Sequence, residues 1–136
     1  MTRLNSTHHP GRAFTLLEMT IVLLVLIALL STGLFVSKKT TEWQLGRQAS
    51  ETLRSVYSAQ RMYLAENPTA SVSNLTNALL LPYMPNSPTT MPTVTSLTNT
   101  TLTIIVNVMP PVVNNGSGVA YDPSGSTTDS LWDVGP

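Results

Sequence analysis

The chain has 136 residues and no cysteine, which excludes disulfides and any thiolate that could act as a nucleophile or metal ligand. Its formal net charge is zero, yet all seven basic residues lie in the first 61 positions, so the remainder offers no basic patch for nucleic acid. Both histidines lie at positions 8 and 9, which leaves the rest of the chain without the usual catalytic base, and we expect no enzyme.

Residues 1–13 form a polar, basic segment that contains a proline and a glycine, MTRLNSTHHPGRA. We expect this segment to be a leader peptide that is not part of the fold. Two other interpretations stay open, namely a secretory signal peptide cleaved at the small residues 31–33 and a plain signal anchor. Glu18 argues against the signal peptide, because a carboxylate is out of place in the apolar region of such a peptide.

The segment that follows is long and apolar. Residues 19–36 are eighteen positions without a charge, enough to cross a bilayer at roughly 1.5 Å of rise per helical residue. We therefore expect a transmembrane helix over residues 14–36. Glu18 lies where the apolar run begins, and an ionised carboxylate would cost about 2.5 to 3.5 kcal/mol near the bilayer centre and less at this edge. A charge in this position is expected to have a partner.

The sequence AFTLLE at residues 13–18, followed by an aliphatic helix, resembles the N-terminal signature of type IV pilins and of the pseudopilins of type II secretion. The resemblance implies that a prepilin peptidase cuts between Ala13 and Phe14 and that the new N-terminus at Phe14 is methylated. It also implies that Glu18 attracts the charged N-terminus of a neighbouring subunit when helices enter a filament core. The family normally has glycine before the cut, whereas this chain has Ala13, which is small enough to take that place.

The same resemblance implies partners and a location. The partners are other copies of the chain in a filament, the prepilin peptidase, a secretion or pilus assembly platform, and the inner membrane. The chain would cross the cytoplasmic (inner) membrane once with its head outside the cytoplasm, and then enter a periplasmic or surface filament. The flanking charges do not settle this orientation, because Arg3 and Arg12 precede the apolar run while Lys38, Lys39 and Arg47 follow it.

Residues 37–66 are expected to continue the helix as an amphipathic half. They contain no proline, and their apolar residues recur at steps of three, four and seven, which indicates one apolar stripe available for packing. The helix should stop at Asn67, because Pro68 biases the residue before it away from helical geometry.

Three arginines recur every seven residues in this half and therefore lie near one face: Arg47, Arg54 and Arg61. Two interpretations stay open. The arginines form a solvated helix face, or they meet an acidic head, either the chain's own or a neighbour's.

Residues 67–136 are expected to form a small, loop-rich β head. The composition predicts a short helix over residues 74–81, a strand over 100–109, its partner over 119–121 and a last strand over 131–134. Together with the resemblance, this predicts an α+β, pilin-like fold. Its long N-terminal helix, half membrane-spanning and half amphipathic, would pack against a small antiparallel sheet.

Three acidic residues lie in a loop rich in glycine and serine near the end of the sequence: Asp122, Asp129 and Asp133. Calcium prefers such hard oxygen ligands, and the family resemblance includes pseudopilins that hold calcium in a C-terminal loop. The spacing matches no EF-hand, and acidic turns are common. A calcium site and a plain acidic turn therefore both stay open, and we expect no other cofactor.

The leading functional prediction is a structural subunit that polymerises through its N-terminal hydrophobic helix into a type IV pilus-like filament or a type II secretion pseudopilus. The alternative is a monomeric, membrane-anchored binding module outside the cytoplasm. That alternative would use the helix only as an anchor and would leave Glu18 and the junction at Phe14 unexplained.

Overall fold

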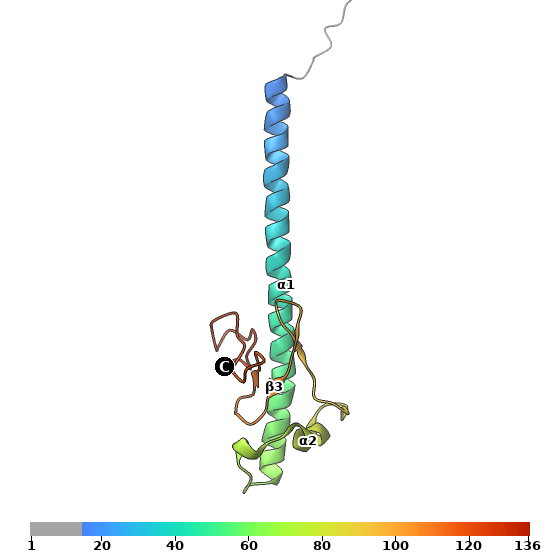
Figure 1. Ribbon diagram of the computed structural model, residues 1–136, viewed down its shortest axis with the longest axis vertical. Helices are drawn as coiled ribbons and strands as arrows, with labels where there is room; N and C mark the ends of the chain where they lie inside the picture. The colour runs from blue at the N-terminus through green and yellow to red at the C-terminus, as the bar shows by residue number, and fades with distance from the viewer. Residues whose placement is uncertain (1–14) are drawn as a thin grey trace, which may run out of the picture. The chain divides into compact units, whose positions relative to one another are not determined.

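The computed structural model describes residues 15–136. The predicted leader and the predicted cleavage and methylation site at Ala13 and Phe14 therefore lie outside the described residues. The described chain divides into two compact units, with the boundary between Lys38 and Lys39. Helix α1, Leu16–Glu66, contributes to both units (Figure 1).

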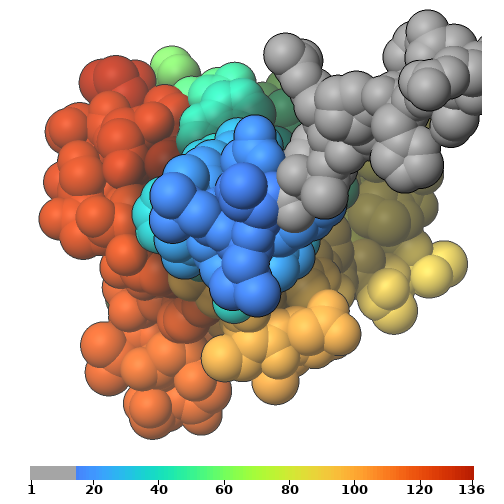
Figure 2. All heavy atoms as spheres, turned by 90° about the horizontal axis from the view of Figure 1, so that it is seen from above, coloured from blue at the N-terminus to red at the C-terminus, as the bar shows by residue number. Residues whose placement is uncertain are grey.

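The N-terminal unit is the first part of α1, and every described residue in it is exposed. Figure 2 shows this segment in blue, and fifteen of its large apolar side chains are exposed. The hydroxyls in the apolar run donate to backbone carbonyls within the helix: Thr20 to Leu17 at 2.8 Å, Ser31 to Ile27 at 2.8 Å and Thr32 to Ala28 at 2.9 Å. These hydroxyls do not need water, and the helix is long and apolar enough to cross a membrane.

The second part of α1 is amphipathic, as the sequence predicts. One face is buried, and it carries the apolar residues Ala49, Leu53, Val56 and Ala59. The helix ends at Glu66, as expected before Pro68. Its end is held by Tyr83, which donates a hydrogen bond to Glu66 Oε2 at 2.5 Å and packs edge-on against Tyr63, with ring centres 5.7 Å apart.

The head after α1 contains short elements that lie along the second part of that helix (Figure 1). The predicted helix over residues 74–81 is confirmed in part. The structure has η1 at Val72–Asn74, α2 at Asn77–Leu80 and η2 at Leu81–Tyr83.

Two two-stranded antiparallel sheets follow in the head. β1, Val94–Thr95, pairs with β2, Thr101–Leu102, with Val94 opposite Leu102. β3, Ile104–Ile105, pairs with β4, Val112–Val113, with Ile104 opposite Val113. The antiparallel pairing was predicted, but the single sheet was not found.

The predicted strand over residues 100–109 is wrong in its extent. It is divided at Thr103 into β2 and β3, which pair with different partners. It also ends early because the buried side chain of Gln60 captures the next carbonyls. Gln60 Nε2 donates to Val106 O at 2.7 Å and to Val108 O at 2.9 Å. Those carbonyls bond to a side chain of α1 instead of to a neighbouring strand.

The other two predicted strands are also wrong. Residues 119–121 contribute only an isolated bridge between Asn114 and Ala120. Residues 131–134 cannot be an extended strand, because Trp132 has a φ of 68° and the preceding Ser130 a φ of 60°. Both angles are in the left-handed region, which is incompatible with strand geometry.

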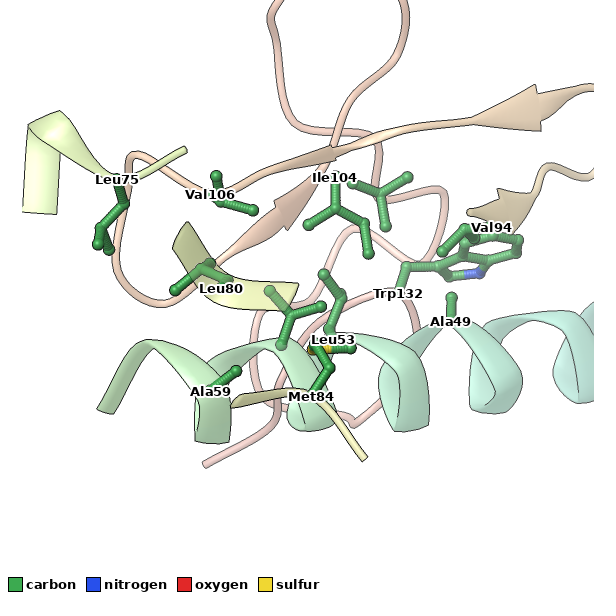
Figure 3. Packing of buried hydrophobic residues seen from close by; sticks show 12 residues of the cluster. Ala49, Leu53, Ala59, Leu75, Leu80, Met84, Val94, Ile104, Val106 and Trp132 are labelled. Atoms are coloured by element: carbon green, nitrogen blue, oxygen red, sulfur yellow. The ribbon is translucent and has the colours of Figure 1, made fainter. Parts of the chain in front are cut away.

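A single hydrophobic cluster holds the head together (Figure 3). In the view of Figure 3, Trp132 lies beside Val94 and Ala49 at one end, and Leu75 and Leu80 lie toward the other end. Leu80 is fully buried and Trp132 is almost fully buried. The apolar stripe of α1 thus packs against residues from the whole length of the head.

The segment at residues 130–135 contacts the backbone of α1 at Gly46. The amide of Trp132 donates to Gly46 O at 3.1 Å. A Cβ placed on Gly46 would lie 2.9 Å from Trp132 Nε1 and 3.2 Å from Leu131 Cβ. Gly46, which lowers helix propensity, is therefore required by packing in the head.

We predict that Gly46→Ala destabilises the head. Overpacking costs about 1 to 3 kcal/mol and alanine regains about 1 kcal/mol of helix propensity, so we expect a net loss of up to about 2 kcal/mol and a Tm fall of up to about 10 °C. Near-UV circular dichroism of the full chain in detergent would follow melting of the packed aromatic residues. Gly33→Ala is the matched control, because a Cβ there meets nothing within 4 Å. A Tm change in Gly46→Ala equal to that in Gly33→Ala would show that residues 130–135 are not packed as described.

Candidate functional site

Glu18 lies in the first turn of α1, and its carboxylate is bound within its own chain. Glu18 Oε2 accepts hydrogen bonds from the Thr15 backbone amide at 3.0 Å and from Thr15 Oγ1 at 3.3 Å. In return, the Glu18 amide donates to Thr15 Oγ1 at 3.2 Å. This reciprocal arrangement is a capping box, in which each side chain satisfies a backbone amide that the helix start leaves unpaired.

The sequence analysis singled out Glu18 but missed its partner. The signal was present, because threonine followed three residues later by glutamate, ahead of an apolar run, is the sequence pattern of a capping box. The helix dipole also favours a negative charge in the first turn. Glu18 is thus held by local interactions in a single copy of the chain, before any neighbour is considered.

The basic residues of α1 fall into two groups. Arg54 contacts the head, because its Nε donates to Val134 O at 2.9 Å and one terminal nitrogen donates to Ser130 Oγ at 2.9 Å. Arg47 and Arg61 instead lie over aromatic rings one turn earlier. The guanidinium carbons are 5.7 Å from the Trp43 ring centre and 5.9 Å from the Tyr57 ring centre, respectively.

Neither alternative for the arginines therefore holds for all three of them. Arg54 meets its own head, but through neutral oxygen atoms. Within residues 15–136 the structure contains one ion pair, between Lys39 and Glu42 at 3.0 Å, so none of the three arginines is paired with a carboxylate.

The three aspartates of the predicted calcium site have different surroundings. Asp122 Oδ1 accepts bonds from the Ser124 amide at 3.0 Å and from Ser124 Oγ at 2.6 Å. Asp129 Oδ1 accepts from the Leu131 amide at 2.9 Å. Both oxygens of Asp133 are shielded from water and accept no hydrogen bond. In the part of the chain that the structure describes, no three acidic or histidine side chains are grouped to hold a metal ion. Calcium binding stays a prediction.

The surroundings of Asp133 disfavour its charge. Burial raises the pKa of its carboxyl above the ordinary value of 3.8, and the nearby charges of Asp129 and Asp122 raise it further. The backbone amides of Gly135 and Ser130 lower the pKa, but the effect of burial is larger. Folding therefore disfavours the ionised form of Asp133, in the segment that packs on α1.

A shallow groove lies beside this segment, with a volume of about 410 Å³. Its lining is mostly apolar and includes Trp43, Leu97, Pro123 and Leu131, with Lys39 and Glu42 at its edge. The groove has the volume of a small-molecule site, but it is open to solvent. Its two charged lining residues, Lys39 and Glu42, form an ion pair with each other.

We predict that Asp133→Asn stabilises the head at neutral pH. A carboxyl whose pKa is raised by folding contributes stability below its unfolded pKa, and this stability is lost as pH rises through the folded pKa. Asparagine removes that loss, so the variant should have a higher Tm at pH 7 and no advantage near pH 3. Melting curves across this range would measure it, with exposed Glu51→Gln as the control. An Asp133→Asn chain that melts below the wild type at pH 7 would contradict the assignment.

No known family model, no curated protein and no solved structure matches the chain. Its function therefore has to be inferred from its own residues and their geometry.

Proposed function

We propose that the chain is a structural subunit that polymerises through its N-terminal hydrophobic helix into a type IV pilus-like filament or a type II secretion pseudopilus, after a prepilin peptidase removes residues 1–13. The observation that carries this proposal is the combination at the start of α1. An acidic side chain is fixed in the first turn of a helix whose following residues are apolar and exposed on every side.

The apolar part of α1 needs a cover, and two covers suit it. A bilayer would surround it in a membrane-anchored monomer, and the helices of other copies would surround it in a filament. Both would serve in turn for a subunit that is stored in the inner membrane, with its head outside the cytoplasm, and is then moved by an assembly platform into a filament.

The geometry of Glu18 suits such a transfer. Its Oε2 atom takes both bonds from Thr15, which lowers the cost of holding a carboxylate at the edge of the membrane. Inside a bundle of apolar helices the charge would need a cation, because an unpaired buried charge costs several kcal/mol. The amino group that cleavage before Phe14 creates on a neighbouring subunit is such a cation.

A monomeric, membrane-anchored binding module is the second candidate, and the groove beside Trp43 favours it. The two candidates differ in what Glu18 does. The filament subunit needs the charge for assembly, whereas the anchored module needs Glu18 only to cap the helix.

We predict that the mature chain begins at Phe14 with a methylated amine. Mass spectrometry of the N-terminal peptide, taken from membranes of cells that possess the peptidase, measures this directly. An intact Met1 in such cells, or a chain that begins near Lys38, would contradict the cleavage.

We predict that Glu18→Gln and Glu18→Ala both block filament assembly. Glutamine can keep the capping box but removes the charge, while alanine removes both. Filament yield after shearing, measured against total protein, would report assembly. Membrane insertion should persist in both variants, because removing a charge from the edge of an apolar run lowers its transfer cost.

Thr15→Ala is the matched control for Glu18. It removes the side-chain cap, at a cost of about 0.5 to 2 kcal/mol of helix stability, but keeps the charge, so it should assemble better than Glu18→Gln. Normal assembly of Glu18→Gln together with failure of Glu18→Ala would assign Glu18 to capping alone and would favour the anchored module.

A further inference from the structure

The groove beside Trp43 lies where the second unit of the chain begins. Lys39 is the first residue of that unit, and it lines the groove together with Glu42 and Trp43 of α1 and with Leu97 of the head. Trp43 is 56% exposed and Leu97 is 40% exposed. Two large apolar side chains that are open to water therefore meet in one groove, with a charged pair at its edge.

The walls of the groove are held by contacts within the head. The amide of Leu97 donates to Tyr121 Oη at 3.1 Å. The Tyr121 ring packs edge-on against Trp132, with ring centres 5.2 Å apart. Ser124 Oγ, in the loop that forms another part of the lining, donates to Asp122 Oδ1 at 2.6 Å. The groove is therefore already formed in the chain alone, as binding sites for small ligands usually are.

The chain connection keeps this groove close to whatever surrounds the apolar run. Val36 ends that run, and Lys39 follows three residues later. Three residues span at most about 11 Å, even when fully extended. The headgroup region adds about 5 to 8 Å on each side of the hydrocarbon core of a bilayer. When the apolar run crosses a bilayer, the long side chain of Lys39 is therefore within reach of the headgroups.

The charges around the groove suit a headgroup that carries both signs. Lys39 Nζ and Glu42 Oε2 lie 3.0 Å apart, and both side chains are accessible to water. The head supplies no further cation, because residues 67–136 contain no basic residue, and the loop beside the groove carries Asp122 and Asp129. This surplus of negative charge disfavours a purely anionic headgroup. A phosphate suits Lys39, however, and an ammonium group suits Glu42.

We propose that the groove binds the headgroup of a zwitterionic phospholipid, with the phosphate on Lys39, the ammonium group on Glu42 and the glycerol end against Trp43 and Leu97. Tryptophan is enriched at the membrane–water interface, and the face of its ring attracts quaternary ammonium groups. This inference requires the apolar run to lie in a bilayer, a condition that both candidate functions share. It does not require assembly of several copies.

Quenching of tryptophan fluorescence tests the site in the full chain. The chain has two tryptophans, and Trp43→Phe identifies the signal of Trp43. The chain is reconstituted in vesicles of phosphatidylcholine or of phosphatidylglycerol, each with the same small fraction of phosphatidylcholine that is spin-labelled at the headgroup. Trp43 should be quenched in both. Its apparent affinity for the labelled lipid should be about two- to fivefold higher in phosphatidylglycerol vesicles, where no other zwitterionic lipid competes.

Charge variants then test what selects the headgroup. Lys39→Gln with Glu42→Gln removes both charges of the groove, leaves the net charge unchanged and should abolish the preference. Lys38→Gln with Glu51→Gln is the matched control, because it removes one charge of each sign outside the groove and should keep the preference. Leu97→Ser removes apolar contact but no charge, so it should lower the quenching of Trp43 in both kinds of vesicle.

Four outcomes would contradict the proposal. Equal apparent affinity in the two kinds of vesicle would overturn it, as would a preference that persists in Lys39→Gln with Glu42→Gln. Stronger quenching by a spin-labelled phosphatidylglycerol would assign the groove to anionic lipid and would also overturn it. Unquenched Trp43 in a chain that floats with the vesicles would overturn this inference alone, because the membrane anchor would be intact. A chain that does not float with the vesicles would overturn it and would also count against both candidate functions.

Discussion

The need to cover the apolar surface of α1 constrains everything else about this protein. Fifteen large apolar side chains between Leu16 and Val36 are exposed. Burial of one such side chain is worth about 1.5 to 3 kcal/mol, so their total is tens of kcal/mol, above the 5 to 15 kcal/mol of net stability that is typical of a domain. Transfer of this surface from water into a bilayer, or against other helices, is therefore strongly favourable.

Glu18 shows how one residue can serve two demands on this helix. The first turn of a helix leaves backbone amides unpaired. In the capping box, the Thr15 amide bonds to the Glu18 carboxylate and the Glu18 amide bonds to the Thr15 hydroxyl. The same carboxylate is the one charge between residues 15 and 37. A role in capping does not compete with a role in assembly, because a carboxylate has more than two acceptor positions and Oε2 alone holds Thr15. Capping fixes the carboxylate at the edge of the helix, where another chain could approach it.

The sequence predicted the helix far better than the head, for physical reasons. Hydrophobic periodicity and Pro68 determine α1 locally, so its end at Glu66 was predictable. The strands depend on distant partners. Gln60 takes carbonyls that a strand would use, and Ser130 and Trp132 adopt left-handed angles that non-glycine residues rarely show. Glu18 was found from its pattern, and Thr15 could have been. The role of Arg54 depends on residues about eighty positions away, which no local pattern indicates.

Contacts between apolar helices are strong but carry little information about register, because dispersion and burial are non-directional. A smooth aliphatic helix could slide by a turn against its neighbour at little cost. In the proposed filament, directional interactions would therefore have to set the position of one subunit against the next. On that proposal, Glu18 would fix this position at the start of the helix.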